Sequence, residues 1–271
     1  MVLSTVPIEQ TGMSVSGGFR IHAVALTDVG RDRTVNEDFM YLDESLELFL
    51  VCDGMGGHTN GQLASQMAVE SIVATTKSPE AIASPQEQLV LGLQAANKNI
   101  YAHAANNPDC HGMGTTAVGF RIADKRMQVC HVGDSRLYRL RGPGLQLLTR
   151  DHSLTNLYAD KPELEGRMGP ATSNVIVRAI GLEPNVGVEH REIAIEEDDL
   201  FLLCCDGLND LVEDERILQI LQSDFPLAAM ATQLVQTAND NGGTDNITVI
   251  LVSVLSKESE FMDEGKTTHG F

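Results

Sequence analysis

Two aspartates occupy the same unusual position in this 271-residue sequence. Asp53 follows the apolar run LFLVC, Asp206 follows the run LFLLCC, and a glycine comes directly after each. A strand that is apolar on both faces belongs in a sheet covered on both sides, where a lone ionised carboxylate is costly. Each aspartate therefore needs a partner, and the repetition predicts a site where two buried strands end.

Two further aspartates lie beside strand-like runs, Asp38 in RTVNEDFMYL and Asp245 in GGTDNITVILV. Four carboxylates brought together would repel and raise one another's pKa, so their convergence would require bound cations. Ligands that are all oxygen select hard ions such as Mg²⁺ or Mn²⁺ rather than zinc. Gly54 and Gly207 would allow tight turns and let a backbone carbonyl approach a metal. For any one Asp-Gly pair alone, a plain turn is the favoured interpretation.

The elements that must position these residues are visible as periodic apolar runs. Short turns between many of the strand-like runs indicate antiparallel hairpins. Helical spacing predicts two pairs of helices, over 61–77 and 86–106 and over 213–221 and 226–238. The pattern predicts an α+β fold, with sheets packed face to face and helices outside. The predicted strands cover residues 19–26, 39–43, 46–52, 115–122, 126–133, 136–142, 144–150, 185–195, 200–205 and 246–255.

Composition limits the classes of function. A formal net charge of −19 argues against a nucleic-acid-binding surface and permits cation binding. The first residues lack a basic leader and the chain lacks an apolar run of membrane length, so a cytoplasmic protein without membrane association is expected. Five cysteines without a C-x-x-C pair predict buried thiols in a reducing compartment. Residues 1–18 and 256–271 are predicted to be disordered tails around a single domain, 19–255.

Eight short motifs, taken together, resemble the ordered motif set of the metal-dependent PP2C-type (PPM family) protein serine/threonine phosphatases in their bacterial form. The resemblance covers about residues 21–255 and implies a four-layer α/β/β/α sandwich. In such a sandwich, two antiparallel sheets would be flanked by pairs of helices, with metals at one end. The motifs are RTVNED, DGMGGH, GMGTTAV, VGDSRLY, TRDHSL, VRAIG, CDGL and GGTDNITVI, in this order between residues 33 and 250.

The resemblance implies a two-metal centre that holds Mn²⁺ or Mg²⁺. By position, Asp53 and the carbonyl of Gly54 would bridge the two ions. Asp206 and Asp245 would bind one of them, and Asp38 would act mainly through bound water. The choice between manganese and magnesium stays open.

Other matched positions imply roles around this centre. Asp134 in VGDSR would help Asp206 to hold a third, weaker metal ion, and Arg33 would grip the substrate phosphate. His58 at the end of DGMGGH could be the catalytic acid that protonates the leaving group, and a role in contacting the substrate is an equal alternative. Thr115 and Thr116 are interpreted as structural support.

The implied reaction is hydrolysis of phosphoserine and phosphothreonine in proteins by a metal-bridging hydroxide, without a phosphoenzyme. The metal ions and Arg33 would neutralise the phosphate oxygens in the transition state. Expected substrates are phosphorylated proteins, including a partner serine/threonine kinase, with phosphohistidine or a regulatory protein without a kinase domain as alternatives. A flap of about 155–174 is expected beside the metals, and a monomer is the default.

Two other functions compete with this one. A catalytically weak PP2C fold could serve as a regulatory or binding module, although the five matched aspartates and Arg33 count against it. Cys130 and Arg136 also fit the C-x5-R spacing of cysteine-dependent phosphatases. That second alternative is disfavoured because Asp134 inside the loop would repel both a thiolate and a phosphate.

Overall fold

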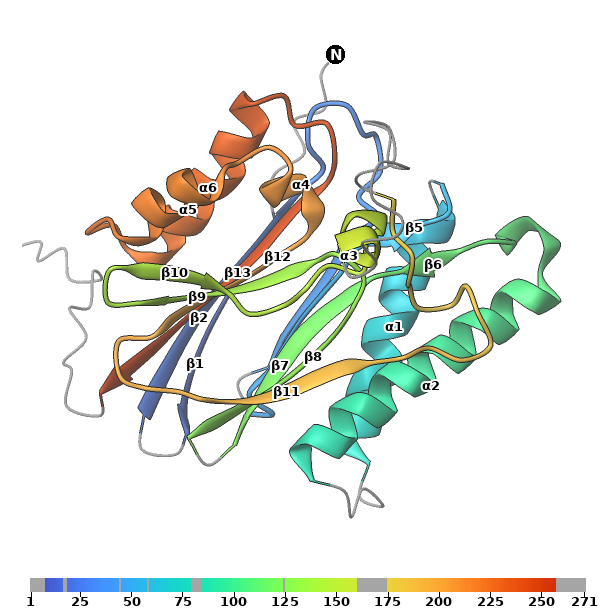
Figure 1. Cartoon of the computed structure of the whole chain (residues 1–271), viewed down its shortest axis with the longest axis horizontal. Helices are drawn as coiled ribbons and strands as arrows, with labels where there is room; N and C mark the ends of the chain where they lie inside the picture. The colour runs from blue at the N-terminus through green and yellow to red at the C-terminus, as the bar shows by residue number, and fades with distance from the viewer. Residues whose placement is uncertain are drawn as a thin grey trace, which may run out of the picture.

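The computed structural model describes residues 8–16, 19–43, 45–57, 59–78, 84–123, 125–159 and 175–256. Two antiparallel sheets pack face to face, and a pair of helices covers the outer face of each (Figure 1). This architecture confirms the predicted α+β sandwich of four layers. Among the described helices, none combines the length and the apolar character needed to cross a bilayer.

The first sheet has six strands in the order β1-β2-β13-β12-β9-β10. Helices α5 (Asp214–Leu221) and α6 (Leu227–Asp240) cover its outer face. The strands are β1 (Ile8–Ser16), β2 (Phe19–Asp28), β13 (Ile247–Ser256), β12 (Leu200–Cys204), β9 (Arg136–Arg141) and β10 (Gly144–Leu147).

The second sheet has five strands in the order β11-β8-β7-β4-β3. Helices α1 (Thr59–Lys77) and α2 (Pro85–Asn106) cover it, and Ser84 begins α2 with a capping box to Glu87. The strands are β11 (Glu189–Ala194), β8 (Arg126–Val132), β7 (Ala117–Ala123), β4 (Leu48–Cys52) and β3 (Phe39–Asp43).

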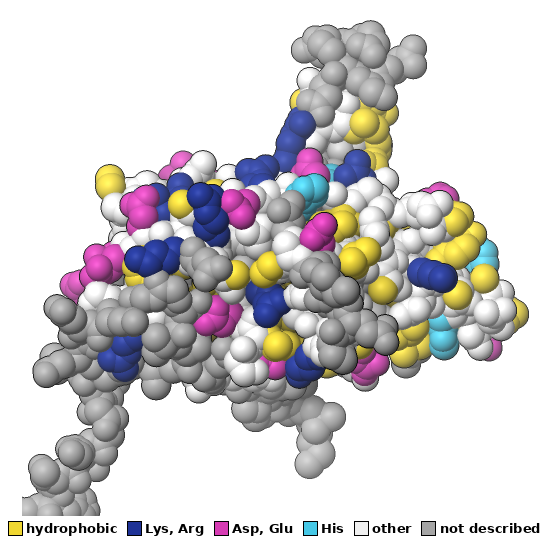
Figure 2. Space-filling view, turned by 90° about the horizontal axis from the view of Figure 1, so that it is seen from below, with side chains coloured by type: hydrophobic (Ala, Val, Ile, Leu, Met, Phe, Trp, Pro, Cys, Tyr) yellow, Lys and Arg dark blue, Asp and Glu magenta, His cyan; other side chains and the backbone are white. Residues whose placement is uncertain are grey.

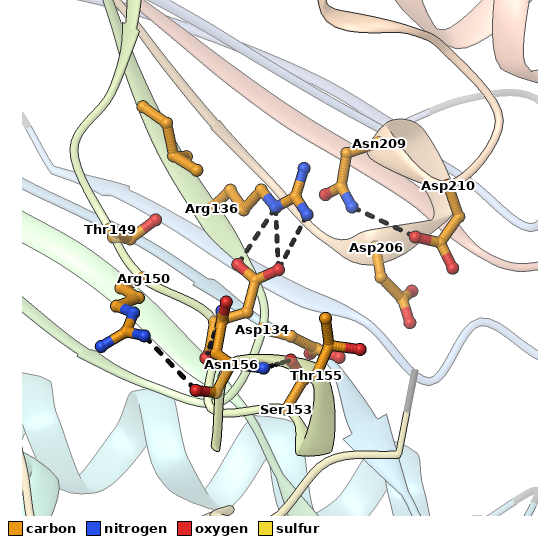
Figure 3. Close-up of a pocket in the computed structure, with 12 residues that line it drawn as sticks. Asp134, Arg136, Thr149, Arg150, Ser153, Thr155, Asn156, Asp206, Asn209 and Asp210 are labelled. Atoms are coloured by element: carbon orange, nitrogen blue, oxygen red, sulfur yellow. Dashed lines mark hydrogen bonds and ion pairs between the residues drawn. The ribbon is translucent and has the colours of Figure 1, made fainter. Parts of the chain in front are cut away.

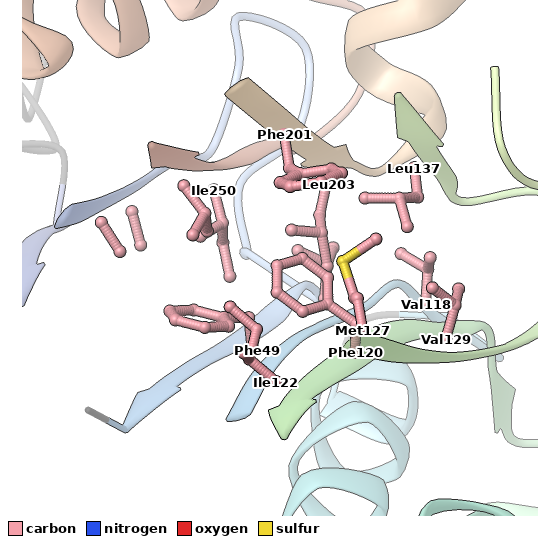
Figure 4. Packing of buried hydrophobic residues seen from close by; sticks show 14 of the residues in the cluster. Phe49, Val118, Phe120, Ile122, Met127, Val129, Leu137, Phe201, Leu203 and Ile250 are labelled. Carbon is pink, nitrogen blue, oxygen red and sulfur yellow. The ribbon is translucent and has the colours of Figure 1, made fainter. Parts of the chain in front are cut away.

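Strands β4 and β12 are fully buried because each contributes to two hydrophobic clusters. Phe49 and Phe201 point between the sheets, where they lie on either side of Phe120 with ring centroids 5.0 and 5.8 Å from it (Figure 4). Alternate residues, such as Leu50 and Leu202, point to the helices instead. Each of these two strands packs against the other sheet on one face and against helices on its other face, which explains why both faces are apolar.

The N-terminal region differs from the sequence prediction. Ile8–Ser16 pairs along its whole length with β2 as the edge strand β1, where a loose tail was expected. The pairing is made by the backbone, and the sequence IEQTGMSVS carries too little apolar alternation to reveal it. Residues 1–7 and 257–271 lie outside the described residues.

Several short elements were not predicted either. Their lengths are below what periodicity in the sequence can detect. They are β5 (Gly54–Met55), β6 (Gly114–Thr115), α3 (Leu154–Ala159), α4 (Asp206–Asn209) and a 3₁₀ turn (Pro108–Cys110). On the face of the molecule shown in Figure 2, acidic and basic side chains are interspersed.

Candidate metal centre

Antiparallel pairing brings the candidate aspartates to one end of the sandwich. Phe39 pairs with Cys52, so Asp38 before β3 lies beside Asp53 after β4. Cys204 pairs with Val249 and also with Arg136 in the neighbouring strands. Three more aspartates therefore come to the same edge of the other sheet, namely Asp206 after β12, Asp245 before β13 and Asp134 before β9.

The side chains of these aspartates converge. Carboxylate oxygens of Asp38 and Asp53 and the sulfur of Cys205 lie within 4.8 Å of one another. Burial, reinforced by the Asp206 and Asp38 charges, raises the pKa of Asp53 well above its ordinary value. Burial also raises the pKa of Asp38 to about 7 and that of Asp206 to about 6, with Asp245 adding to both effects. The centre is thus a cluster of carboxylates that cannot all ionise cheaply without positive charge.

Unpartnered oxygens show that this cluster fits a cation. Among the described residues, Asp38 Oδ1, Asp134 Oδ1 and Asp206 Oδ1 are buried without any hydrogen-bond donor. Buried carboxylate oxygens are normally satisfied, because an unpaired one loses its hydration without compensation. Mg²⁺ or Mn²⁺ would satisfy them, since both ions prefer oxygen ligands.

A chain of buried hydroxyls holds the other oxygen of Asp38. Thr248 Oγ1 donates to Asp38 Oδ2 at 2.6 Å, and its oxygen lies 2.6 Å from Thr27 Oγ1. Asn36 Nδ2 donates to Thr27 Oγ1 at 2.8 Å. This chain fixes the carboxylate so that Oδ1 stays free. Sequence analysis missed both threonines, because only the register of β2 and β13 places them opposite each other.

Asn246 fixes the loop that carries Arg33. Its Oδ1 accepts the backbone N–H of Glu37 at 2.8 Å. Its Nδ2 donates to the carbonyls of Val29 and Val35 at 2.9 and 3.0 Å. The loop is therefore held against the segment just before β13. Sequence analysis also missed this residue, although it stands in the TDN motif.

Arg33 lies at the rim of the centre and pairs with one of the candidate ligands. Its Nη2 donates to Asp245 Oδ2 at 2.7 Å, with 47% of the Arg33 side chain and 36% of the Asp245 side chain exposed. Solvent screening makes such an exposed pair weak. The guanidinium is thus placed beside the carboxylates and can exchange partners.

The two glycines of the Asp-Gly pairs are required by close backbone packing, a reason that the sequence did not reveal. Neither Gly54 nor Gly207 has a positive φ. A Cβ on Gly54 would lie 2.1 Å from the carbonyl oxygen of Gly61, and one on Gly207 would lie 2.0 Å from that of Asn246. Close backbone packing, not a left-handed turn, therefore excludes a side chain at both positions.

The predicted structural role of Thr115 and Thr116 is confirmed. The carbonyl of Asp53 accepts hydrogen bonds from Thr116 N–H and Thr115 Oγ1, both at 2.8 Å. Thr116 Oγ1 accepts the Asp53 N–H at 3.1 Å and lies 2.7 Å from Ser135 Oγ. These bonds fix the backbone of Asp53 and tie it to the loop that carries Asp134.

Asp134 lines a polar pocket beside the centre, with a volume of about 290 Å³ (Figure 3). Burial, followed by the charge of Asp206, raises the pKa of Asp134 to about 7. Arg136 in the same pocket donates to both oxygens of Asp151, at 3.0 and 2.7 Å, and to Tyr138 Oη at 3.0 Å. The structure therefore brings Asp134 near Asp206, and Arg136 is paired with Asp151.

The geometry contradicts the cysteine-dependent alternative. Cys130 lies in β8, 1% exposed, with its side chain in the cluster between sheet and helices α1 and α2. Burial raises the pKa of its thiol to about 12. Arg136 belongs to the other sheet. A phosphate-binding loop that joins the two is absent from this described part of the chain.

Two predictions fall on residues that the structure does not describe. His58 lies outside the described residues, so its catalytic role stays a prediction. Of the predicted flap, 155–159 belong to α3, and 160–174 lie outside the described residues.

Comparisons with known proteins agree with the fold and identify the family. The family model for protein phosphatase 2C matches residues 30–252. The chain is 36% identical to a serine/threonine phosphatase, Stp, of Listeria innocua, over 91% of this chain and 99% of the relative. It is 35% identical to the protein phosphatase PhpP of Streptococcus pneumoniae, over 87% and 98%.

A solved structure is similar as well. The catalytic domain of the serine/threonine protein phosphatase PstP, in complex with two manganese ions, is 35% identical, with a TM-score of 0.75. The similarity covers 87% of this chain and 99% of that one. With its sandwich fold and its converging aspartates, the chain belongs to the protein phosphatase 2C family and is a phosphatase of the bacterial type.

Proposed function

We propose that this chain hydrolyses phosphoserine and phosphothreonine in proteins, using Mn²⁺ or Mg²⁺ at the carboxylate centre. One observation supports this function above all. Three buried oxygens, on Asp38, Asp134 and Asp206, converge at one end of the sandwich without a donor. Such a cluster costs free energy in a protein that does not bind cations there.

The ligand set follows the predicted positions. Asp53, the carbonyl of Gly54, Asp206 and Asp245 would hold two core ions, with Asp38 contacting them mainly through water. Asp134 and Asp206 would hold a third, weaker ion. When bound, these cations lower the pKa of water and neutralise phosphate oxygens.

The chain's own residues orient the reactants. Arg33 stands at the rim, where its guanidinium can leave Asp245 and grip two phosphate oxygens in a bidentate arrangement. Asp38, held at Oδ2 by Thr248, presents Oδ1 as a hydrogen-bond acceptor that orients the attacking water. In this proposal the phosphoryl group passes directly to water, so no side chain of the protein has to act as the nucleophile.

The relatives named as serine/threonine phosphatases support phosphorylated proteins as the substrate class. A serine/threonine kinase is the first candidate among these substrates. The protein is further proposed to be a cytoplasmic monomer without nucleic-acid or membrane partners.

The direct test is hydrolysis of p-nitrophenyl phosphate and of a phosphothreonine peptide. Both should require added Mn²⁺ or Mg²⁺, stop with EDTA and continue after thiol alkylation. Absence of hydrolysis with every divalent ion would favour the regulatory or binding module. Activity in EDTA that is lost in Cys130→Ser would favour the cysteine-dependent mechanism.

A further inference from the structure

His152 binds both polar groups of the backbone at Gly133, the residue directly before Asp134. The Gly133 N–H donates to His152 Nδ1 at 3.0 Å, and this hydrogen bond is buried. The His152 N–H donates in return to the Gly133 carbonyl at 2.9 Å. One histidine therefore fixes the peptide from which Asp134 starts.

The backbone at Gly133 needs such a partner. Its φ is +109°, a conformation that glycine adopts far more readily than other residues. A Cβ at this position would lie 2.6 Å from side-chain atoms of Thr116, the residue that also binds the backbone of Asp53. A buried N–H in this tight position costs free energy unless an acceptor reaches it. His152 Nδ1 is that acceptor.

His131, in β8, makes the reciprocal contact. Its Nε2 donates to the carbonyl of Arg150 at 3.0 Å. The rings of His131 and His152 stack, with centroids 4.9 Å apart and an angle of 11° between their planes. Each ring thus binds the backbone of the segment that carries the other ring. This histidine pair joins the end of β8 to the segment before α3.

The Gly133 N–H also decides where His152 carries its proton. A backbone N–H can only donate, so Nδ1 is unprotonated and the neutral ring is protonated at Nε2. Arg178 Nη1 lies 2.9 Å from Nε2, but this exposed side chain can turn to solvent, whereas the Gly133 peptide is fixed. A metal ion on Nε2 would require the proton on Nδ1. The ring is therefore suited to holding Gly133 and not to binding a metal.

The surroundings keep this ring neutral. Only 8% of His152 is exposed. Burial, followed by the charges of His131 and Arg178, lowers the pKa of His152 to about 3. Protonation at Nδ1 would break the hydrogen bond to Gly133, so the neutral form is the one that holds the loop.

We infer that His152 is a positioning residue for the reaction, because its bonds to Gly133 keep the carboxylate of Asp134 directed at the third metal position. The inference rests on the proposed function, in which Asp134 and Asp206 hold that ion. Asp134 Oδ1 has no hydrogen-bond donor among the described residues. The direction of this oxygen therefore depends on the backbone before it, and His131 supports His152 in fixing that backbone.

Three substitutions of His152 separate the acceptor from the bulk of the side chain. In His152→Asn, the amide oxygen can replace Nδ1 and accept the Gly133 N–H. In His152→Gln the amide lies further out, at the position of Nε2, and in His152→Phe the ring has no acceptor. If the Phe variant does not fold, the comparison of Asn with Gln decides.

The Gln and Phe variants should lower kcat for p-nitrophenyl phosphate at saturating Mn²⁺ by roughly fivefold or more, with little change in KM. The Asn variant should stay within roughly twofold of the wild type. Calorimetry should show the two core ions bound as in the wild type and the third ion bound more weakly in the Gln and Phe variants. His190→Phe is the control, since His190 is an exposed histidine in β11, and it should behave as the wild type.

A double-mutant cycle tests whether His152 acts through Asp134. Added to Asp134→Ala, His152→Phe should lower kcat no further, because the residue that it positions is already absent. A full additional loss of kcat would overturn the inference. So would a His152→Phe variant that melts at a lower temperature but keeps the wild-type kcat, because the histidine would then only stabilise the fold.

A metal-free measurement completes the test. In EDTA-treated protein, the ¹⁵N signals of the His152 ring should show the proton on Nε2. Hydrogen exchange at the Gly133 N–H should be roughly tenfold faster or more in the Gln and Phe variants, but not in the Asn variant. A proton on Nδ1, or unchanged exchange in all variants, would overturn the inference. Failure of the proposed function is separate, because the wild type would then not hydrolyse p-nitrophenyl phosphate with Mn²⁺.

Discussion

Arg33 Nη2 donates to Asp245 Oδ2 at 2.7 Å, so the residue expected to hold the phosphate is paired with an expected metal ligand. The pair is half-exposed, and its contribution to the free energy of unfolding should be below about 1 kcal/mol. Arg33 can therefore leave Asp245 and bind the substrate at little cost in free energy.

Arg33→Ala should raise KM for a phosphopeptide roughly 10- to 100-fold, because charge-assisted hydrogen bonds to phosphate are lost. Manganese binding measured by calorimetry and the melting temperature should change little. Arg31→Ala, in the same loop, is the control and should behave as wild type. Unfolding of the Arg33 variant would instead make this residue a structural ion-pair partner.

Asp134→Ala separates catalysis from loop structure. Because Asp134 is buried with an unpartnered oxygen, its removal should leave the metal-free melting temperature unchanged or higher. The loss of a third metal site should lower kcat at saturating Mn²⁺ by about tenfold or more, since the effect is mainly on the transition state. Asp206→Asn, which alters both sites, should be worse. A less stable Asp134 variant with normal kcat would assign the residue to the turn.

The pKa of Asp38 predicts how stability depends on pH without metal. Burial raises this pKa to about 7 in the folded protein, against about 4 in the unfolded chain. The folded state then binds more protons between these values, so this carboxyl group destabilises the protein progressively as pH rises from about 4 to 7. The Asp38→Asn variant lacks this pH-dependent destabilisation, because an asparagine side chain cannot ionise.

The melting temperature of the wild type minus that of Asp38→Asn, both in EDTA, should therefore fall between pH 5 and pH 7.5. The paired comparison is needed because His152 acts in the opposite direction, its pKa being lowered to about 3 by burial. With saturating Mn²⁺ the difference should rise with pH instead, because the metal binds the ionised carboxylates. A metal-free difference that increases with pH would contradict the burial of Asp38.

Thr248→Val should weaken metal binding at the centre without replacing a proposed metal ligand. The substitution leaves Asp38 Oδ2 without its donor, at a cost of about 1–3 kcal/mol in unfolding free energy. Manganese affinity should fall because the carboxylate is no longer fixed. Thr248→Ser keeps the hydroxyl and should restore the affinity. If both variants bind manganese as the wild type does, the hydroxyl chain does not orient Asp38.

Particular residues show how far the sequence could lead. The convergence of Asp53 and Asp206 could be predicted, because both end apolar strands that had to lie in covered sheets. The roles of Thr27 and Thr248 could not, since they depend on the exact register between β2 and β13. Gly54 was expected in the site, yet its packing against Gly61 is a tertiary contact that no local pattern encodes.

Strand β1 shows a second limit. Its residues gain order from backbone pairing with β2, and such pairing leaves little trace in side-chain hydrophobicity. The pocket beside Asp134 could not be predicted either, because its walls come from three separate segments, 134–136, 147–156 and 206–210. Only the folded chain brings these segments together.

The most direct test of the central claim is a Mn²⁺ titration of EDTA-stripped protein that follows calorimetric binding and phosphothreonine-peptide hydrolysis in the same samples. Hydrolysis should be absent at the start and rise with metal occupancy. Asp53→Asn should lose both tight binding and hydrolysis while remaining folded. Full hydrolysis before any manganese is bound, or in Asp53→Asn without bound metal, would contradict a metal-dependent phosphatase centred on these aspartates.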